Sequence, residues 1–272
     1  MSPVLAGTNV AAYVDQAVWW KALLALVVAL ALQVGVNYAN DYSDGVRGTD
    51  ADRVGPLRLV GSGTTAAADV KRAAFVAFGV AMAAGLVLAA TSSWWLLLVG
   101  AAAVVAAWFY TGGSQPYGYH ALGEVMVFVF FGLVAVLGTT YVQTGLLPAP
   151  GWSAAVGVGA LACAILVANN VRDIPTDATS GKRTLAVVLG DARSRALYAL
   201  LVFVAAATLV GLAVTTSWLA LLGLTFLVPA VSATRLVLSG TTGRGLVPVL
   251  QQTGVAELLY ASGVLVGLLV AS

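Results

Sequence analysis

The sequence predicts an all-α membrane protein, a polytopic helical bundle with about nine transmembrane helices around a central cavity. Three observations support this fold class. Of the 272 residues, 60% are hydrophobic and only 9% are charged, whereas soluble domains carry roughly 25% charged residues. Eight apolar runs are each long enough to cross the hydrocarbon core, which takes about 20 helical residues. The charged residues lie between these runs and gather mainly on one side.

The predicted spans follow one another along the whole chain, so we expect a single transmembrane domain over 1–272. They cover 17–38, 71–90, 93–110, 121–142, 152–171, 194–214, 217–238 and 247–271. A further apolar segment, 2–13, is too short to cross a bilayer as a helix. We expect it to be the second half of a ninth span, so that the first helix is apparently truncated.

The distribution of basic residues predicts the orientation. When the spans are threaded up and down, 12 of the 13 basic residues fall on one side, and only Lys21 falls near the other. Six of the seven tryptophans lie where helices begin at the opposite face, as expected for an interfacial aromatic belt. The positive-inside rule therefore predicts a multi-pass protein of the cell membrane whose basic side faces the cytoplasm.

A first polar stretch closes the first long apolar run on this basic side. Residues 37–50 read NYANDYSDGVRGTD. If the helix continues through them, four side chains share one face, because they are spaced at three, four and seven residues. These are Asn37, Asn40, Asp41 and Asp44.

A second polar stretch, NNVRDIPTDATSGKR, closes another apolar run in the same way. Asn169, Asp173 and Asp177 follow at four-residue steps. We therefore predict a pseudo-repeat with equivalent acidic motifs at 37–52 and 169–183. An aspartate-rich solvated loop is the simpler alternative, but such loops do not ordinarily repeat a face of amides and carboxylates at two helix ends.

Facing each other, the two acidic helix ends would form a divalent-metal site. Mg²⁺ takes one or two protein carboxylates, keeps several waters and completes its octahedron with phosphate oxygens of the substrate. Carboxylates at membrane depth are costly unless they are paired or metal-bound. We therefore predict that Mg²⁺ ions clamp a diphosphate between the two ends. The predicted metal ligands, which are also the predicted catalytic residues, are Asp41, Asp44, Asp173 and Asp177.

Polar residues beside the acidic motifs are candidate substrate contacts. The guanidinium fork of arginine suits phosphate, and the amides can hold waters or phosphate oxygens. Tyr110 starts a loop rich in glycine and aromatics that could cover the site as a lid, and Glu124 begins a span on the same side. The predicted substrate-binding residues are Asn37, Asn40, Arg47, Arg53, Tyr110, Glu124, Asn169, Asn170, Arg172, Lys182 and Arg183.

Several function classes are disfavoured. No phosphate-cradling GxxxxGK[ST] and no Cys/His spacing typical of metal sites occurs, and we expect no nucleic-acid partner. A CDP-alcohol phosphatidyltransferase is disfavoured because its DGxxAR pattern fails after Asp44 and Gly45. A transporter with a carboxylate-lined site remains an alternative, although it would place charges near mid-membrane.

Four ordered motifs carry a resemblance to a known family. They read NYANDYSDGVRGTD, DRVGPLRLVGSG, YTGG followed by PYGYHALGE, and NNVRDIPTDATSGKRTLAVVLG. Over almost the whole chain the sequence resembles the UbiA superfamily of intramembrane aromatic prenyltransferases, and within it the 1,4-dihydroxy-2-naphthoate prenyltransferases of menaquinone synthesis. The resemblance implies nine helices around a central cavity that opens sideways to lipid. It also implies Mg²⁺ ions that bridge both aspartate motifs to a polyprenyl diphosphate.

The resemblance also implies residue roles and a reaction. The metal and diphosphate would be bound by Asn37, Asp41, Asp44, Asn169, Asp173 and Asp177, with Lys182 and Arg183 as diphosphate contacts. The reaction would transfer the polyprenyl group to 1,4-dihydroxy-2-naphthoate, with loss of carbon dioxide, to give demethylmenaquinol. Another aromatic acceptor such as 4-hydroxybenzoate would use the same chemistry. The sequence leaves the prenyl chain length and the oligomeric state open.

Overall fold

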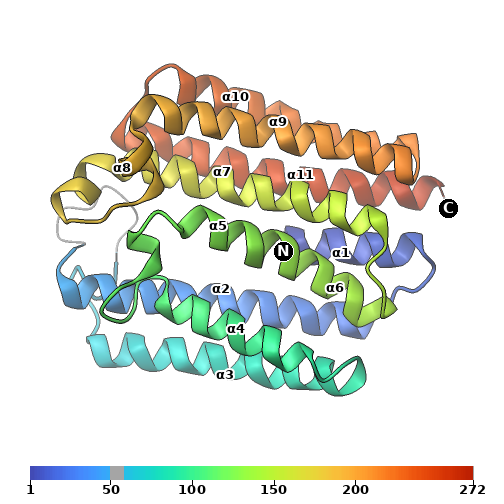
Figure 1. The fold of residues 1–272 in the computed structure, drawn as a ribbon, viewed down its shortest axis with the longest axis horizontal. Helices are drawn as coiled ribbons and strands as arrows, with labels where there is room; N and C mark the ends of the chain where they lie inside the picture. The colour runs from blue at the N-terminus through green and yellow to red at the C-terminus, as the bar shows by residue number, and fades with distance from the viewer. Residues whose placement is uncertain (50–57, 272) are drawn as a thin grey trace.

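The helices run side by side, and their ends lie at two opposite faces of the molecule (Figure 1). This computed structural model describes residues 1–49 and 58–271. The helical elements are α1 (Ser2–Tyr13), α2 (Trp19–Arg47), α3 (Ala67–Thr91), α4 (Leu96–Phe109), η1 (Tyr117–Tyr119), α5 (Gly123–Val127), η2 (Phe128–Val134), α6 (Ala135–Thr144), α7 (Ala149–Thr179), α8 (Leu185–Leu189), α9 (Asp191–Thr215), η3 (Trp218–Phe226), α10 (Leu227–Leu238), η4 (Gly243–Leu246) and α11 (Val247–Ala271). Over the described ranges the structure contains no strand, only an isolated bridge between His120 and Arg183.

Each of the eight predicted apolar runs forms helical structure. Within the described residues, seven helical stretches are long and apolar enough to cross a membrane. The eighth run forms α4, which has 14 residues, and the short N-terminal segment forms α1, which has 12. Both are shorter than the roughly 20 residues that a full span takes. The all-helical membrane fold is thus confirmed, while the count of nine transmembrane helices stays a prediction.

The two polar motifs are continuous with the long helices that precede them. Helix α2 has 29 residues and ends at Arg47, and the next residue, Gly48, has a left-handed φ of +73° that suits glycine. Helix α7 has 31 residues and continues past Pro175 to Thr179. Both helices end at the same face of the bundle, close to α8 (Figure 1). The helical spacing assumed from Asn37 to Asp44 and from Asn169 to Asp177 is therefore confirmed, while residues 50–52 of the first motif lie outside the described residues.

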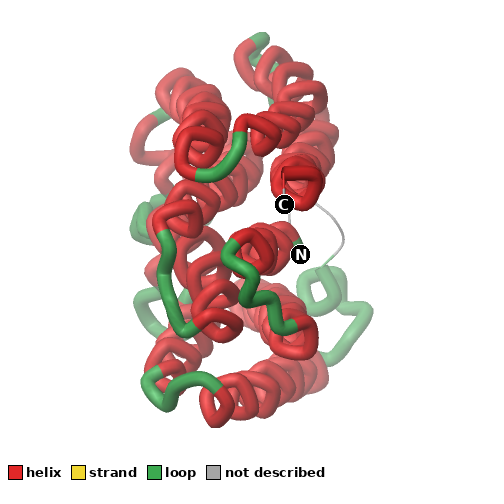
Figure 2. The backbone as a smooth tube through the Cα atoms, turned by 90° about the vertical axis from the view of Figure 1, so that its right-hand side faces the viewer, coloured by secondary structure: helices red, strands yellow, loops and turns green. Residues whose placement is uncertain are grey.

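Helix α7 lies at the centre of the main hydrophobic core. Its buried side chains pack with those of α1, α6, α9, η3, α10 and α11, whereas α2 and α3 contribute to two smaller clusters. Small residues let the helices approach closely, as is typical of membrane bundles. A Cβ atom on Gly132 of η2 would lie 2.7 Å from the Cα atom of Gly159 on α7. The view along the helices shows them gathered in one bundle, with loops at the ends (Figure 2).

The two ends of the bundle differ in composition. At the end opposite α8, the Lys21 ammonium donates to the Thr91 and Val142 carbonyl oxygens at 2.9 and 2.8 Å and so ties three helix ends together. The six tryptophans assigned to the belt at this end are all exposed: Trp19, Trp20, Trp94, Trp95, Trp152 and Trp218. Exposed aromatics at helix ends suit a membrane interface.

Candidate active site

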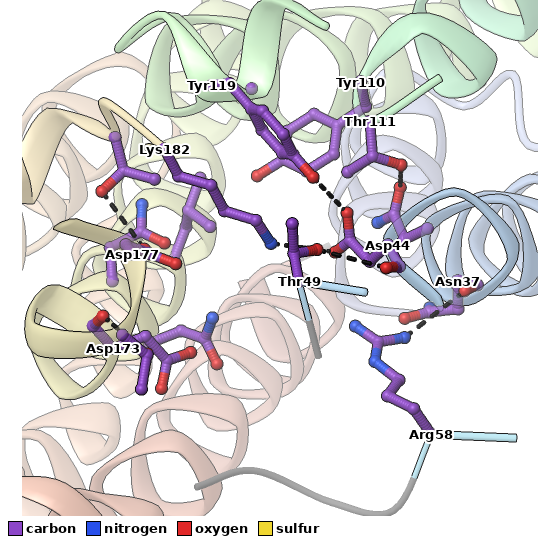
Figure 3. A pocket seen from close by; sticks show the side chains of 17 residues that line it. Asn37, Asp44, Thr49, Arg58, Tyr110, Thr111, Tyr119, Asp173, Asp177 and Lys182 are labelled. Atoms are coloured by element: carbon purple, nitrogen blue, oxygen red, sulfur yellow. Dashed lines mark hydrogen bonds and ion pairs between the residues drawn. The ribbon is translucent and has the colours of Figure 1, made fainter. Parts of the chain in front are cut away.

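A polar cavity of about 240 Å³ lies at the end of the bundle where α2 and α7 finish. Asp44 and Asn37 lie on one side of it, and Asp173 and Asp177 lie on the other (Figure 3). Lys182 extends between the two sides. The structure therefore brings residues of both acidic motifs to one cavity, although they lie more than a hundred positions apart in the chain.

The Asp44 carboxylate is held by partners from two other segments. The Tyr119 hydroxyl donates to Asp44 Oδ1 at 2.5 Å, and the Lys182 ammonium forms an ion pair with Asp44 Oδ2 at 3.2 Å. The ammonium also lies 4.9 Å from the centroid of the Tyr119 ring, within the range of a cation–π contact. Each oxygen of Asp44 thus has one protein partner and keeps a lone pair for a ligand.

This arrangement sets the protonation of both partners. Burial by itself would lower the pKa of Lys182, but the nearby Asp44, Tyr119 and Asp177 groups raise it above its usual value. Burial, followed by the charge of Asp44, raises the pKa of Tyr119. At neutral pH Lys182 is therefore a cation, and Tyr119 is a neutral hydrogen-bond donor.

Asp41 does not line the cavity and instead anchors a backbone segment. Its Oδ2 accepts from the Leu59 N–H at 2.9 Å, and its Oδ1 accepts from the Val60 N–H at 3.0 Å. Asp41 is buried, so these two bonds satisfy a charge that burial would otherwise make costly. They hold the segment around Arg58, whose side chain lines the cavity.

Near the end of α7, Arg172 forms hydrogen bonds with Asp173 and Asn169. Its guanidinium donates to Asp173 Oδ1 at 2.7 Å, to Asp173 Oδ2 at 2.6 Å and to Asn169 Oδ1 at 2.8 Å. The Arg172 side chain is fully buried and does not line the cavity. Its contacts are therefore with the residues predicted to bind the ligand.

Three other predicted contacts also lie outside the cavity lining. The Glu124 carboxylate accepts a hydrogen bond from the side-chain NH₂ group of Asn170 at 2.9 Å. Arg47 donates to the Thr111 and Gly113 carbonyl oxygens and borders a separate recess of about 340 Å³. Arg183 is exposed, and its backbone N–H donates to the Tyr119 carbonyl at 3.0 Å. Arg53 lies outside the described residues.

Nine of the predicted site residues do line the cavity. They are Asn37, Asn40, Asp44, Tyr110, Asn169, Asn170, Asp173, Asp177 and Lys182. Several other residues that line it were not predicted from the sequence, among them Thr49, Thr111, Tyr119 and Thr184. The aromatic loop after Tyr110 was the one available signal, because it contains Tyr119.

Hydrogen bonds and ring contacts hold this loop beside the cavity. The Gly118 N–H donates to the Tyr110 carbonyl at 2.9 Å, and the Tyr110 and Tyr117 rings meet edge to face at 5.5 Å. The Tyr117 hydroxyl donates to the Ala106 carbonyl oxygen at 2.7 Å. Burial raises the pKa of Tyr117 to about 12, and burial, followed by the charge of Glu124, raises the pKa of Tyr110. Both phenols therefore stay neutral beside the carboxylates.

The oxygen atoms that line the cavity suit Mg²⁺, but a bound ligand must supply some of its coordination. Carboxylate and amide oxygens are the hard donors that Mg²⁺ prefers. Within residues 1–49 and 58–271, no three Asp, Glu, His or Cys side chains are grouped closely enough to hold a metal ion by themselves. A magnesium ion here would thus need further oxygens, which a bound diphosphate and water can supply.

Comparisons with known proteins identify the family of this chain. Residues 1–244 match the UbiA prenyltransferase family. The 1,4-dihydroxy-2-naphthoate octaprenyltransferase of Mycobacterium tuberculosis is 55% identical over 264 residues, which cover 97% of this chain and 90% of that protein. The protein of the same name from Escherichia coli is 38% identical over 197 residues, which cover 67% of this chain and 64% of that protein.

Solved structures share the fold at low sequence identity. A UbiA homolog from Aeropyrum pernix K1 superposes with a TM-score of 0.74 at 15% identity, covering 97% of this chain and 96% of that one. A UbiA homolog from Archaeoglobus fulgidus, bound to GPP and Mg²⁺, superposes with a TM-score of 0.62 at 14% identity, covering 98% and 95%. The family match over most of the chain and the identity to a relative of similar length lead to one conclusion. The protein is a prenyltransferase and belongs to the UbiA prenyltransferase family.

Proposed function

We propose that the protein transfers a polyprenyl group from polyprenyl diphosphate to 1,4-dihydroxy-2-naphthoate, as in menaquinone biosynthesis. The observation that carries the proposal is the cavity at which both acidic helix ends meet, with the Lys182 cation between them. The choice of acceptor is supported by the 55% identical relative, which carries that activity in its name. A related structure with bound GPP and Mg²⁺ supports a prenyl diphosphate as donor.

The residues of the cavity divide into those that suit a cation and those that suit a diphosphate. Asp44, Asp173 and Asp177 would hold Mg²⁺, and when bound the ion would neutralise charge on the departing diphosphate. The Lys182 ammonium now pairs with an Asp44 oxygen. It could bind a diphosphate oxygen instead, since carboxylate and diphosphate oxygens are both anionic. Arg58 lies on the cavity wall, where it can reach the same group.

The reaction needs a developing allylic cation to meet an electron-rich ring before water does. The allylic C–O bond breaks, and the electron pair leaves with the diphosphate. The ring carbon that bears the carboxylate then bonds to the terminal prenyl carbon, and the C–C bond to the carboxylate breaks as carbon dioxide leaves. Tyr110, Tyr119 and Leu166 border the cavity, and their apolar surfaces would help to exclude water from the cation.

We further propose that the cavity faces the cytoplasm. The basic residues gather at the α8 end of the bundle, and the exposed tryptophans of the belt lie at the other. Under the positive-inside rule the α8 end is cytoplasmic. Single cysteines introduced at Arg183 and at Ser217 in a Cys163→Ala background would test this. A membrane-impermeant maleimide added to whole cells should label only the Ser217 site, and the reverse pattern would contradict the orientation.

The purified protein in detergent or nanodiscs tests the proposed reaction directly. It is given Mg²⁺, a polyprenyl diphosphate and either 1,4-dihydroxy-2-naphthoate or 4-hydroxybenzoate, and the products are identified by mass spectrometry. We expect a decarboxylated prenyl naphthoquinol that disappears when EDTA removes the metal. A prenylated hydroxybenzoate alone would keep the mechanism and correct the acceptor. If neither acceptor gives a product, the proposed function is wrong.

A further inference from the structure

Two adjacent asparagines at the end of α7 are held in different ways. Asn169 and Asn170 both line the cavity. Each is bonded to a charged residue that does not line it, Arg172 in one case and Glu124 in the other. The chemistry of these two partners determines which end of each amide remains for a ligand.

Arg172 leaves Asn169 as a donor. A guanidinium has N–H donors and no acceptor, so the Asn169 atom 2.8 Å from Arg172 Nη2 must be the carbonyl oxygen. The same guanidinium donates to both carboxylate oxygens of Asp173, and these two hydrogen bonds fix its orientation. The free end of Asn169 is then its NH₂ group.

Glu124 leaves Asn170 as an acceptor. The Asn170 NH₂ donates to Glu124 Oε1 at 2.9 Å, and a carboxylate in its ionised form can only accept. The Cys163 thiol donates to the Glu124 backbone carbonyl at 3.1 Å and helps to fix the start of α5. The free end of Asn170 is its carbonyl oxygen, because the NH₂ group is bonded to Glu124.

We propose that Arg172 and Glu124 are positioning residues that fix Asn169 and Asn170 with opposite polarity. Asn169 donates to a diphosphate oxygen, and Asn170 accepts from a magnesium-bound water or binds the ion itself. Turning Asn169 over would set its NH₂ group against the donors of Arg172, and turning Asn170 over would set its oxygen against the ionised Glu124 carboxylate; a buried site penalises both. The ligand identity rests on the proposed function, whereas the polarity rests on the two contacts alone.

Amide-to-carboxylate substitutions test the proposal, because they should have unequal effects at the two positions. Asn169→Asp keeps an acceptor for Arg172 but replaces the free donor by a second acceptor. Glu124→Gln combined with Asn170→Asp keeps the buried bond in reversed direction, leaves the formal charge unchanged and retains an oxygen toward the cavity. The readout is binding of inorganic pyrophosphate with Mg²⁺ by calorimetry, together with binding of Mn²⁺ alone by electron paramagnetic resonance.

We expect Asn169→Asp to weaken pyrophosphate binding by about tenfold to a hundredfold, the effect of losing a charge-assisted hydrogen bond. The Glu124→Gln/Asn170→Asp pair should bind pyrophosphate within about threefold of the wild type and Mn²⁺ at least as tightly. Asn169→Leu, which adds no charge, should lose binding in the same direction as Asn169→Asp. Equal losses at the two positions, or wild-type binding by Asn169→Leu, would overturn the assignment.

A variant of Arg172 and a matched control test its positioning role. Arg172→Lys keeps the charge but cannot hold Asp173 and Asn169 with one planar fork, so pyrophosphate binding should weaken several-fold. Arg195→Lys is the matched variant, because Arg195 is also buried and paired with an aspartate but lies outside the cavity; its binding should match the wild type. Since pyrophosphate and Mn²⁺ are the probes, failure of naphthoate prenylation would refute the proposed function without affecting this test.

Discussion

The two acidic helix ends look alike in sequence but are built differently. At the end of α2, the partners of the carboxylates come from far along the chain. Asp41 binds a segment 18 and 19 residues on, and Asp44 binds side chains 75 and 138 residues on. At the end of α7, Asp173 and Asn169 are held by Arg172, one and three residues away.

The two ends should therefore become organised at different stages of folding. At the α7 end, the contacts of Asp173 and Asn169 with Arg172 lie within a single helix, so they can form as soon as that helix does. The α2 end depends on the segment around Arg58, on the loop after Tyr110 and on Lys182, and each must dock before the carboxylates are satisfied. The α2 end should therefore be the one that responds to changes elsewhere in the chain.

The largest effect should come from Asp173→Asn. The substitution removes a proposed metal ligand and leaves the buried Arg172 guanidinium without its counter-charge. We expect turnover to fall by at least about a hundredfold, the size of effect typical for loss of an electrostatic contact to the reacting group. Prenyl transfer by the purified variant measures this. Activity above a tenth of the wild type would show that the α7 end is not required.

Asp41→Asn should act on the neighbouring segment as well as on turnover. An amide can accept at only one of the two positions now used by the Leu59 and Val60 N–H groups, so the segment around Arg58 should loosen. We expect trypsin to cleave after Arg58 several-fold faster in metal-free protein. Asp173→Asn is the control and should leave this cleavage rate unchanged. An unchanged rate in Asp41→Asn would mean that Asp41 does not anchor the segment.

Lys182→Met should have a moderate effect on donor binding. The substitution removes the cation paired with Asp44 and the proposed contact to the diphosphate, while the chain length stays similar. We expect the KM for polyprenyl diphosphate to rise about tenfold, since a hydrogen bond to a charged group is worth roughly 1.5–3 kcal/mol. Steady-state kinetics with varied donor and fixed acceptor measures this. A change confined to the acceptor KM would place Lys182 on the other substrate.

Tyr119→Phe should have the smallest effect, and its pH dependence is informative. The variant keeps the ring beneath Lys182 and loses the hydroxyl that donates to Asp44, so we expect a several-fold loss of activity at neutral pH. Because the pKa of Tyr119 is raised, the wild-type bond is present at neutral pH and is lost only as the pH rises through that raised value. The difference between wild type and variant should therefore shrink only in strongly alkaline buffer. A difference that vanishes below pH 9 would contradict the assignment.

Much of the fold was predictable because its signals are local. Hydropathy over some twenty residues determines a span, and every predicted apolar run is helical in the structure. The three-to-four spacing of Asn37, Asp41 and Asp44 was a correct indication of one helical face in α2. The count of nine spans was not settled, because α1 and α4 are short.

The roles of individual side chains were less predictable. Spacing placed Asp41 and Asp44 on one face, but only Asp44 borders the cavity. Nothing in the sequence near Tyr119 indicated that its hydroxyl would reach an aspartate 75 residues away. The Mg²⁺ ligands and the pseudo-repeat of the two acidic motifs remain predictions.

By itself, the sequence determined the membrane-spanning class, the order of the helices, the family and the two acidic faces. These follow from hydropathy, helical period and motif, all of which are properties of neighbouring residues. Only the tertiary structure decided which atoms of each face are free. Arg172 and Glu124 claim one end of each asparagine amide, and Asp44 takes its partners from distant loops. A hydrogen bond forms only when donor and acceptor lie about 3 Å apart. Whether two separate segments come that close depends on how the whole chain packs.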